Sequence, residues 1–252
     1  MTMKYDFIEV VGLEKAPFYQ KDAQPLAVYQ CDRSNLTFAS GSDDGDPILN
    51  WNPVVGNTTC IPSNQTYFRN FAGRGLGYSA SGPTPPPDQF ISYSFGANLT
   101  GPFTFVITAQ SAVGGAPVAN ARLFSIGNNL SPISHIEIVY GAAHTTALTF
   151  ERGDDVGNVD LIPLGDPGSD PFVVYAAYDG TSLYWSLNGA PISSALAVSG
   201  AVSLDAARWG IYATNNVLKS LASLRAWYVD NTYRDPVQAT SLIRYYCRQI
   251  GL

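Results

Sequence analysis

Charged residues are scarce in this chain. Only 13% of its 252 residues are Asp, Glu, Lys or Arg, against roughly a quarter in a typical globular domain. The 20 acidic residues outnumber the 14 basic ones and leave a net charge of −6. Because phosphate backbones are bound by clustered Lys and Arg, this balance argues against a nucleic acid partner. The acidity is uneven, since residues 203–252 carry six basic and three acidic side chains.

Long hydrophobic runs are also missing. No stretch reaches the roughly 18 consecutive apolar residues that a membrane-spanning helix needs, so the sequence predicts no membrane insertion. The N-terminal residues MTMKYDFIEVVGLEK lack the basic start and apolar core of a secretory signal, and we expect no signal peptide.

Cysteine and histidine are few. The three cysteines, Cys31, Cys60 and Cys247, cannot all pair within one chain and have no Cys-x-x-Cys spacing. This pattern favours buried free thiols, with a Cys31–Cys60 disulfide as the alternative. The only histidines are His135 and His144, and neither has a cysteine nearby, so the sequence predicts no zinc site.

Glycine, proline and aromatic residues are abundant, which is typical of a loop-rich β-protein. The segment Phe172–Gly189, FVVYAAYDGTSLYWSLNG, predicts two strands separated by a tight turn. Asp179-Gly180 favours a type I′ turn, and Asn188-Gly189 predicts a second tight turn. Alternation places Leu183, Trp185 and Leu187 on one face of the second strand, and Tyr184 and Ser186 on the other.

Similar patterns predict a series of strands from residue 90 onwards. The expected strands are 90–95, 102–109, 121–126, 135–140, 146–151, 158–162, 172–178, 182–187, 195–198, 208–212 and 221–229.

One helix is expected, at the C-terminus. Asp235 suits the N-cap, Pro236 the first helical position and Gln238 the capping box. Ala239, Ile243, Tyr246 and Ile250 form one apolar stripe, and Gly251 can end the helix. Arg244 and Arg248 complement the helix dipole at this end.

Several segments in order resemble one fold family. They are RNFAGRGLGYSASGPTPPPDQFISY at 69–93, GPFTFVITA at 101–109, RLFSIG at 122–127, the hairpin described above, WGIY at 209–212 and SLASLRAWYVD at 220–230. Together they resemble laminin-G-like members of the concanavalin A-like sandwiches. The resemblance implies an all-β, two-sheet antiparallel jelly roll with a short C-terminal helix. That fold hosts lectins, glucanases, adhesion modules and structural domains.

We predict two parts along the chain. Residues 1–22 form an N-terminal arm for assembly or attachment, because their apolar residues have no strand partner in the pattern. Residues 23–252 form a single sandwich domain, whose first strand is Pro25–Gln30. Residues 31–66 are rich in Asn, Asp, Ser, Thr, Gly and Pro and are predicted to be long loops.

Catalysis is not expected. Glucanases of this fold carry Glu-x-Asp-x-x-Glu on one strand, but this chain has Val139 two residues after Glu137 and no Glu at the last position of the motif. His135 and Glu137 share a strand face and form a conceivable acid/base pair, but a solvated face is the favoured interpretation. The paired carboxylates of a glycosidase are therefore missing from the linear motif.

Binding sites are predicted in the loops. Trp51, within Asn-Trp-Asn-Pro, is a candidate for stacking on a sugar ring, and Tyr184 is a second aromatic candidate. Asp154 and Asp155 would supply hydrogen bonds to a glycan or ligands to Ca²⁺. The cluster Asp43, Asp44 and Asp46 is another candidate calcium site, although solvated turns are the favoured interpretation of both groups. No other cofactor is expected.

The function predicted from these features is that of a non-enzymatic virion surface protein, such as a phage tail-fibre, receptor-binding or capsid-decorating protein. It would be made in the host cytoplasm, bind other virion proteins or itself through the arm, and bind host-surface polysaccharide through the sandwich. A glycan-active enzyme or a free carbohydrate-binding lectin is the alternative.

Overall fold

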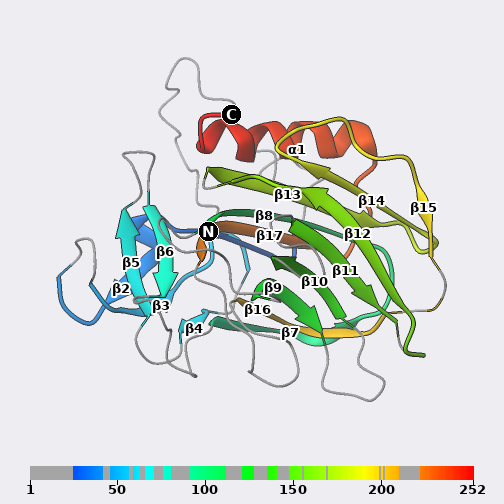
Figure 1. The fold of residues 1–252 in the computed structure, drawn as a ribbon. Helices are drawn as coiled ribbons and strands as arrows, with labels where there is room; N and C mark the ends of the chain where they lie inside the picture. Colours follow the sequence, from blue (N-terminus) through cyan, green and yellow to red (C-terminus); the bar gives the residue numbers. More distant parts are fainter. Residues whose placement is uncertain are drawn as a thin grey trace, which may run out of the picture.

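The chain folds as a sandwich of two antiparallel sheets, with helix α1 covering the outer face of one of them (Figure 1). The computed structural model describes residues 25–41, 46–56, 59–62, 66–70, 76–80, 91–111, 121–127, 135–140, 148–154, 156–168, 170–198, 200, 202–209 and 222–252. The predicted all-β jelly-roll sandwich with a C-terminal helix is confirmed. None of the helices in these ranges is long and apolar enough to span a membrane.

The first sheet has eight strands and carries the helix. Their order is β15 (Leu196–Ala197), β14 (Ser182–Leu187), β13 (Pro171–Tyr178), β8 (Phe103–Ser111), β17 (Ala222–Asp230), β6 (Leu76–Ala80) and β5 (Thr66–Asn70), and β1 (Ala27–Gln30) also pairs with β17.

The second sheet has seven strands. Their order is β12 (Val159–Gly165), β11 (Leu148–Gly153), β10 (His135–Tyr140), β9 (Ala121–Gly127), β16 (Leu204–Trp209), β7 (Ile91–Leu99) and β4 (Ile61–Pro62). A separate hairpin joins β2 (Leu36–Phe38) to β3 (Ile48–Trp51), after the short 3-10 helix η2 (Arg33–Asn35).

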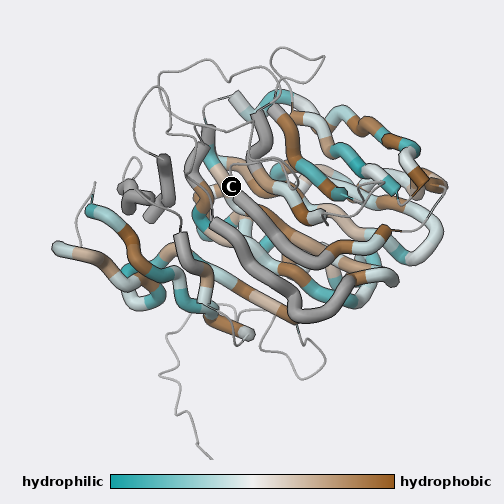
Figure 2. Tube along the Cα trace, turned by 90° about the horizontal axis from the view of Figure 1, so that it is seen from below, coloured by the Kyte–Doolittle hydropathy of each residue, from teal (hydrophilic) through white to brown (hydrophobic). Residues whose placement is uncertain are grey.

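Alternate residues of the facing strands form the core between the sheets, and this alternation can be followed along the tube in Figure 2. Aromatic rings link the two layers. Trp227 of the first sheet stacks on Tyr29 at 4.6 Å and lies 6.1 Å from Phe124 of the second sheet, measured between ring centroids. Such ring pairs add about 0.5–1.5 kcal/mol each beyond their buried area.

Helix α1 (Pro236–Gln249) starts at the predicted capping box. The Asp235 carboxylate accepts hydrogen bonds from the backbone N–H groups of Val237 and Gln238, and the Gln238 side chain accepts one from the Asp235 backbone N–H. The predicted apolar stripe is buried against the outer face of the first sheet, and Gly251 has the positive φ of +79° expected at a helix end. The helix prediction is therefore confirmed.

A buried ion pair ties the start of the helix to the sheet. Arg234 pairs with the fully buried Asp230 at the end of β17, and its Nε donates to Asp230 Oδ2 at 2.8 Å. The Tyr228 hydroxyl donates to the same oxygen at 2.8 Å. These contacts fix the linker from which α1 begins.

Three details differ from the sequence predictions or settle an open choice. Residues 31–66 contain β2, β3 and β4 rather than loops alone. At the β13–β14 turn Gly180 has positive φ but Asp179 does not, and a type I′ turn at Asp179-Gly180 needs positive φ at both, so the type I′ prediction is wrong. All three cysteines are buried free thiols. The predicted arm, residues 1–22, lies outside the described residues.

Candidate functional site

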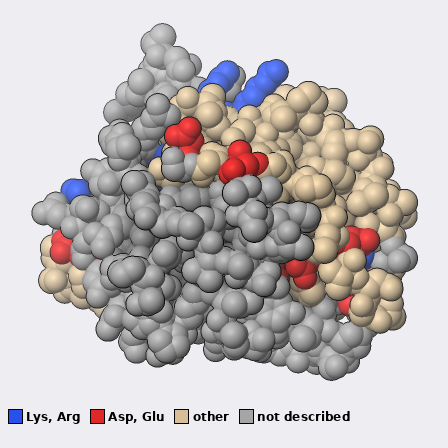
Figure 3. Space-filling view, in the orientation of Figure 1, with Lys and Arg blue, Asp and Glu red and all other residues tan. Residues whose placement is uncertain are grey.

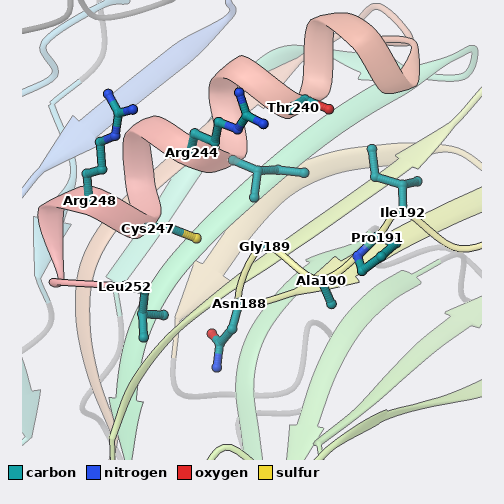
Figure 4. Close-up of a pocket in the computed structure, with 11 residues that line it drawn as sticks. Asn188, Gly189, Ala190, Pro191, Ile192, Thr240, Arg244, Cys247, Arg248 and Leu252 are labelled. Carbon is teal, nitrogen blue, oxygen red and sulfur yellow. The ribbon is translucent and has the colours of Figure 1, made fainter.

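A groove lies between α1 and the turn that follows β14 (Figure 4), and we call it the helix groove. Its volume of about 470 Å³ is within the range of small-molecule sites, roughly 300–1,000 Å³. The lining residues are Asn188, Gly189, Ala190, Pro191, Ile192, Thr240, Ile243, Arg244, Cys247, Arg248 and Leu252.

Asn188 and Gly189 shape the turn side of the groove. Both have positive φ, 53° and 74°, as a type I′ turn requires, which confirms the predicted second tight turn. The Asn188 backbone N–H donates to the Val173 carbonyl at 2.8 Å, and its Oδ1 accepts from the Val173 N–H at 2.8 Å. Strand β13 therefore holds this turn in place.

Arg244 and Arg248 shape the helix side. They lie one helical turn apart on α1, are exposed and line the groove, and in Figure 4 their guanidinium groups extend upwards at its outer rim. Basic side chains stand out above α1 in the space-filling view (Figure 3). No acidic side chain of the described residues forms an ion pair with Arg244. The groove therefore presents positive charge on a chain that is acidic overall.

The remaining lining is mixed in character. Ile192, Ile243 and Leu252 are apolar, and Thr240 contributes a hydroxyl. Burial raises the pKa of the Cys247 thiol, so it stays protonated at neutral pH. Among the described residues that line the groove none is aromatic. Guanidinium groups beside amide and hydroxyl groups suit a carboxylate with neighbouring hydroxyls, since Arg binds carboxylates bidentately.

Trp51 does not offer an exposed ring. It is 1% exposed at the end of β3, where it packs edge-on to Tyr29 at 5.4 Å and donates from Nε1 to the Gln30 carbonyl at 3.0 Å. The prediction of an exposed stacking residue is wrong because the β2–β3 hairpin brings this ring into the inter-sheet core.

Tyr184 lies on the outer face of the first sheet, as the alternation predicts. Its hydroxyl donates to Asp179 Oδ2 at 3.0 Å, which raises the pKa of Tyr184. Its ring lies 5.2 Å from that of Tyr233, before the start of α1. Tyr184 is not among the residues that line the helix groove, and its role in glycan binding stays a prediction.

Asp154 closes the β11–β12 turn. Its Oδ1 accepts from the backbone N–H groups of Val156 and Asn158 at 3.0 and 2.8 Å, and its Oδ2 accepts from Asn158 Nδ2 at 2.7 Å. Burial raises the pKa of this carboxyl, but the hydrogen bonds outweigh burial and the net shift is downward. A fully buried carboxylate used in this way is a turn-forming group.

The other predicted calcium ligands are only partly described. Asp46 packs against Gly41, where an added Cβ would lie 2.1 Å from Asp46 Oδ2. Asp43, Asp44 and Asp155 lie outside the described residues. Both calcium sites stay predictions, and no described contact joins Trp51 to Asp154.

His135 and Glu137 form a buried group with Glu151. They are 5% and 0% exposed, so the interpretation as a solvated face is wrong. Glu151 lies directly opposite Glu137 on β11, and ligand atoms of the three residues lie within 4.8 Å of one another. Because Glu137 is completely buried, the pair is not accessible to a polysaccharide.

The sequence matches no known family profile and no curated protein. Its fold resembles solved structures. The binding domain of botulinum neurotoxin serotype G has a TM-score of 0.60 and 9% identity over 87% of this chain and 50% of that one. The serotype D ligand-binding domain in complex with N-acetylneuraminic acid has a TM-score of 0.60 and 10% identity over 88% and 50%.

A sialidase is also similar. The Trypanosoma rangeli enzyme in complex with 2,3-difluorosialic acid has a TM-score of 0.59 and 12% identity, over 88% of this chain and 32% of that one. This chain thus spans half or less of the three structures named. At these identities the likeness shows the fold alone, a two-sheet β-sandwich.

Proposed function

We propose that this chain is a non-enzymatic glycan-binding domain and that the helix groove binds acidic sugars. The observation that carries the proposal is the placing of Arg244 and Arg248 on one side of the groove, opposite the anchored Asn188 turn. A sugar carboxylate would receive charge-assisted hydrogen bonds from Arg244, and sugar hydroxyls would meet Asn188 and Thr240. The apolar side chains would contact ring carbons or an acetamido methyl group.

The similar structures support sialic acids as the first ligands to test. Two of them hold N-acetylneuraminic acid or a difluoro derivative of sialic acid. Sialic acids combine a carboxylate, hydroxyls and an acetamido group, which are the groups that the lining of the helix groove complements.

A glycan array tests this proposal. We expect the intact protein to bind sialylated or uronic-acid glycans more strongly than their neutral counterparts. Arg244→Gln should weaken binding by about 10- to 100-fold, as loss of a charged hydrogen bond costs about 1.5–3 kcal/mol. The matched control is Arg33→Gln, which removes an exposed arginine from η2, outside the groove. Equal binding of acidic and neutral glycans, or equal losses in the two variants, would refute the proposal.

The alternative of a glycan-active enzyme rests on the cross-strand pair Glu137 and Glu151. A reducing-sugar assay separates the alternatives. We expect no cleavage of sialosides or β-glucans, because Glu137 is fully buried. Cleavage that disappears in Glu137→Gln would establish the enzyme instead.

We also propose a virion surface as the setting of this binding. The low charge, the many aromatic residues and a receptor-binding type of fold support it. Residues 1–22 would attach the domain to other virion proteins or to a second copy. Deletion of these residues should abolish attachment or oligomerisation and leave the thermal midpoint nearly unchanged, and unfolding on deletion would contradict the attachment role.

A further inference from the structure

The outer face of the second sheet carries a compact polar group at the β10–β11 hairpin. In the register of these strands His135 pairs with Gly153, and Glu137 pairs with Glu151. Ile136, Ile138 and Phe150 point into the inter-sheet core. His135, Glu137 and Glu151 therefore share the opposite face, where His135 Nε2 lies 3.0 Å from Glu151 Oε1.

This polar group lies almost entirely out of contact with solvent. The side chain of Glu151 is 14% exposed, and Glu137 is completely buried. Two carboxylates directly opposite each other on neighbouring strands repel, and burial disfavours each charge further.

A neighbouring hydroxyl points to a further ligand at the same place. Ser125 lies opposite Glu137 in the β9–β10 register and shares its face. Ser125 is completely buried, and its Oγ has no hydrogen-bond partner among the described residues. Buried hydroxyls are nearly always hydrogen-bonded. A water molecule held beside Glu137 by a bound ion would satisfy this hydroxyl.

Gly153 leaves room for the imidazole. A Cβ at this position would lie 2.4 Å from Cε1 and 2.6 Å from Nδ1 of His135. Glycine therefore allows the ring to lie over β11 and to direct Nε2 towards Glu151.

We propose that His135, Glu137 and Glu151 form a binding site for a divalent first-row transition ion such as Zn²⁺ or Mn²⁺. The imidazole Nε2 and one oxygen of each carboxylate would be the protein ligands, and water beside Ser125 would complete the shell. One nitrogen and two oxygen ligands suit these ions better than Ca²⁺, which prefers six to eight oxygens. Such an ion would bridge residues of neighbouring strands and so join β10 to β11.

Metal titration of the full chain after treatment with a chelator tests the site. We expect one Zn²⁺ or Mn²⁺ per chain by calorimetry. At a metal concentration roughly 100 times the dissociation constant, the thermal midpoint should rise by about 5–10 °C. Ca²⁺ and Mg²⁺ should give a smaller rise. An unchanged midpoint with both transition ions would overturn the proposal.

Isosteric variants assign the ligands. Glu137→Gln and Glu151→Gln should each weaken metal binding by about 100-fold or more. Ser125→Ala should weaken it by about tenfold, which is within the range for residues that hydrogen-bond to the metal ligands. Asp170→Asn, an equal change of charge at an exposed position, should leave binding unchanged. Binding that survives in Glu137→Gln, or that falls equally in Asp170→Asn, would refute the assignment.

A spectroscopic measurement keeps the test decisive if a Glu variant fails to fold. Co²⁺ bound to the parent protein should give visible d–d absorption. This absorption should disappear when Zn²⁺ displaces the Co²⁺. A parent spectrum identical to that of Co²⁺ in buffer would refute the site, and the charge of the cluster would then be balanced by protonation or by basic residues of the chain.

Discussion

The outer faces of the two sheets are both buried in part, but by different kinds of residue. On the first sheet, apolar side chains such as Val106, Val173 and Ala177 lie under the apolar stripe of α1. On the second sheet, the buried residues of the outer face include the polar side chains of His135, Glu137 and Ser125. An apolar face is stabilised by contact alone, whereas a buried polar face needs a partner for each group. The first face therefore positions the helix groove, and the second carries the proposed ion site.

Loss of the helix contact should give the largest effect on stability. Tyr246 lies on the face of α1 that packs on the first sheet and is completely buried. Tyr246→Ala should therefore lower the free energy of unfolding by about 3–5 kcal/mol. Tyr246→Phe should be neutral or slightly stabilising, because the hydroxyl has no hydrogen-bond partner among the described residues. Urea denaturation measures both. Equal destabilisation by the two variants would show that the hydroxyl, and not the ring packing, holds the helix.

On the second sheet, Gly153→Ala should give the next largest effect. The added Cβ would overlap the His135 ring, and overpacking of this kind costs about 1–3 kcal/mol. The same change should weaken the proposed metal site. A variant as stable as the parent in urea would mean that the ring can move away without loss.

The Asp154 carboxylate should make the stability of the fold decrease as the pH falls in the acid range. Its folded-state pKa is lowered, so its contribution is complete above the unfolded-state pKa, roughly 3.9. The contribution is lost as the pH falls through the lower folded-state value. Thermal midpoints of the parent should therefore drop more steeply below about pH 4 than those of Asp154→Asn. Parallel curves would contradict the role of this carboxylate in the turn.

The smallest effect is expected in thiol labelling. Burial raises the pKa of Cys60 to about 12 and also that of Cys31. Both should resist Ellman's reagent at pH 8 in the folded protein, and all three cysteines should react in denaturant. Cys247 lines the groove, so it should be the first to label, and an acidic sugar should slow its reaction. Rapid labelling of Cys31 or Cys60 in the folded protein would contradict their burial.

Local sequence patterns predicted the regular parts of the fold well. The strands at 135–140 and 182–187 have the predicted bounds, and the capping residues place the helix start correctly. Alternation also placed Leu183 in the inter-sheet core and Tyr184 on the other face. These features depend on neighbours within a few residues, which the sequence displays directly.

The site depended on contacts that the sequence does not display. Alternation put His135 and Glu137 on one face but could not tell whether that face is covered. Glu151 joined them only through the register of the β10–β11 hairpin. Trp51 looked exposed because turn-forming residues surround it, yet β3 pairs with β2 and buries it. Arg244 and Arg248 were explained by the helix dipole, although their spacing of four residues already placed them on one face.

The helix groove can be tested most directly by calorimetry with an acidic sugar and its carboxyl-reduced alcohol, which differ only in the charged group. We predict that the parent binds the acid about 10- to 100-fold more tightly than the alcohol. Arg244→Lys should keep part of this preference, and Arg244→Gln should lose most of it. A preference for the acid that is the same in the parent and in Arg244→Gln would contradict the assignment of the groove as the binding site.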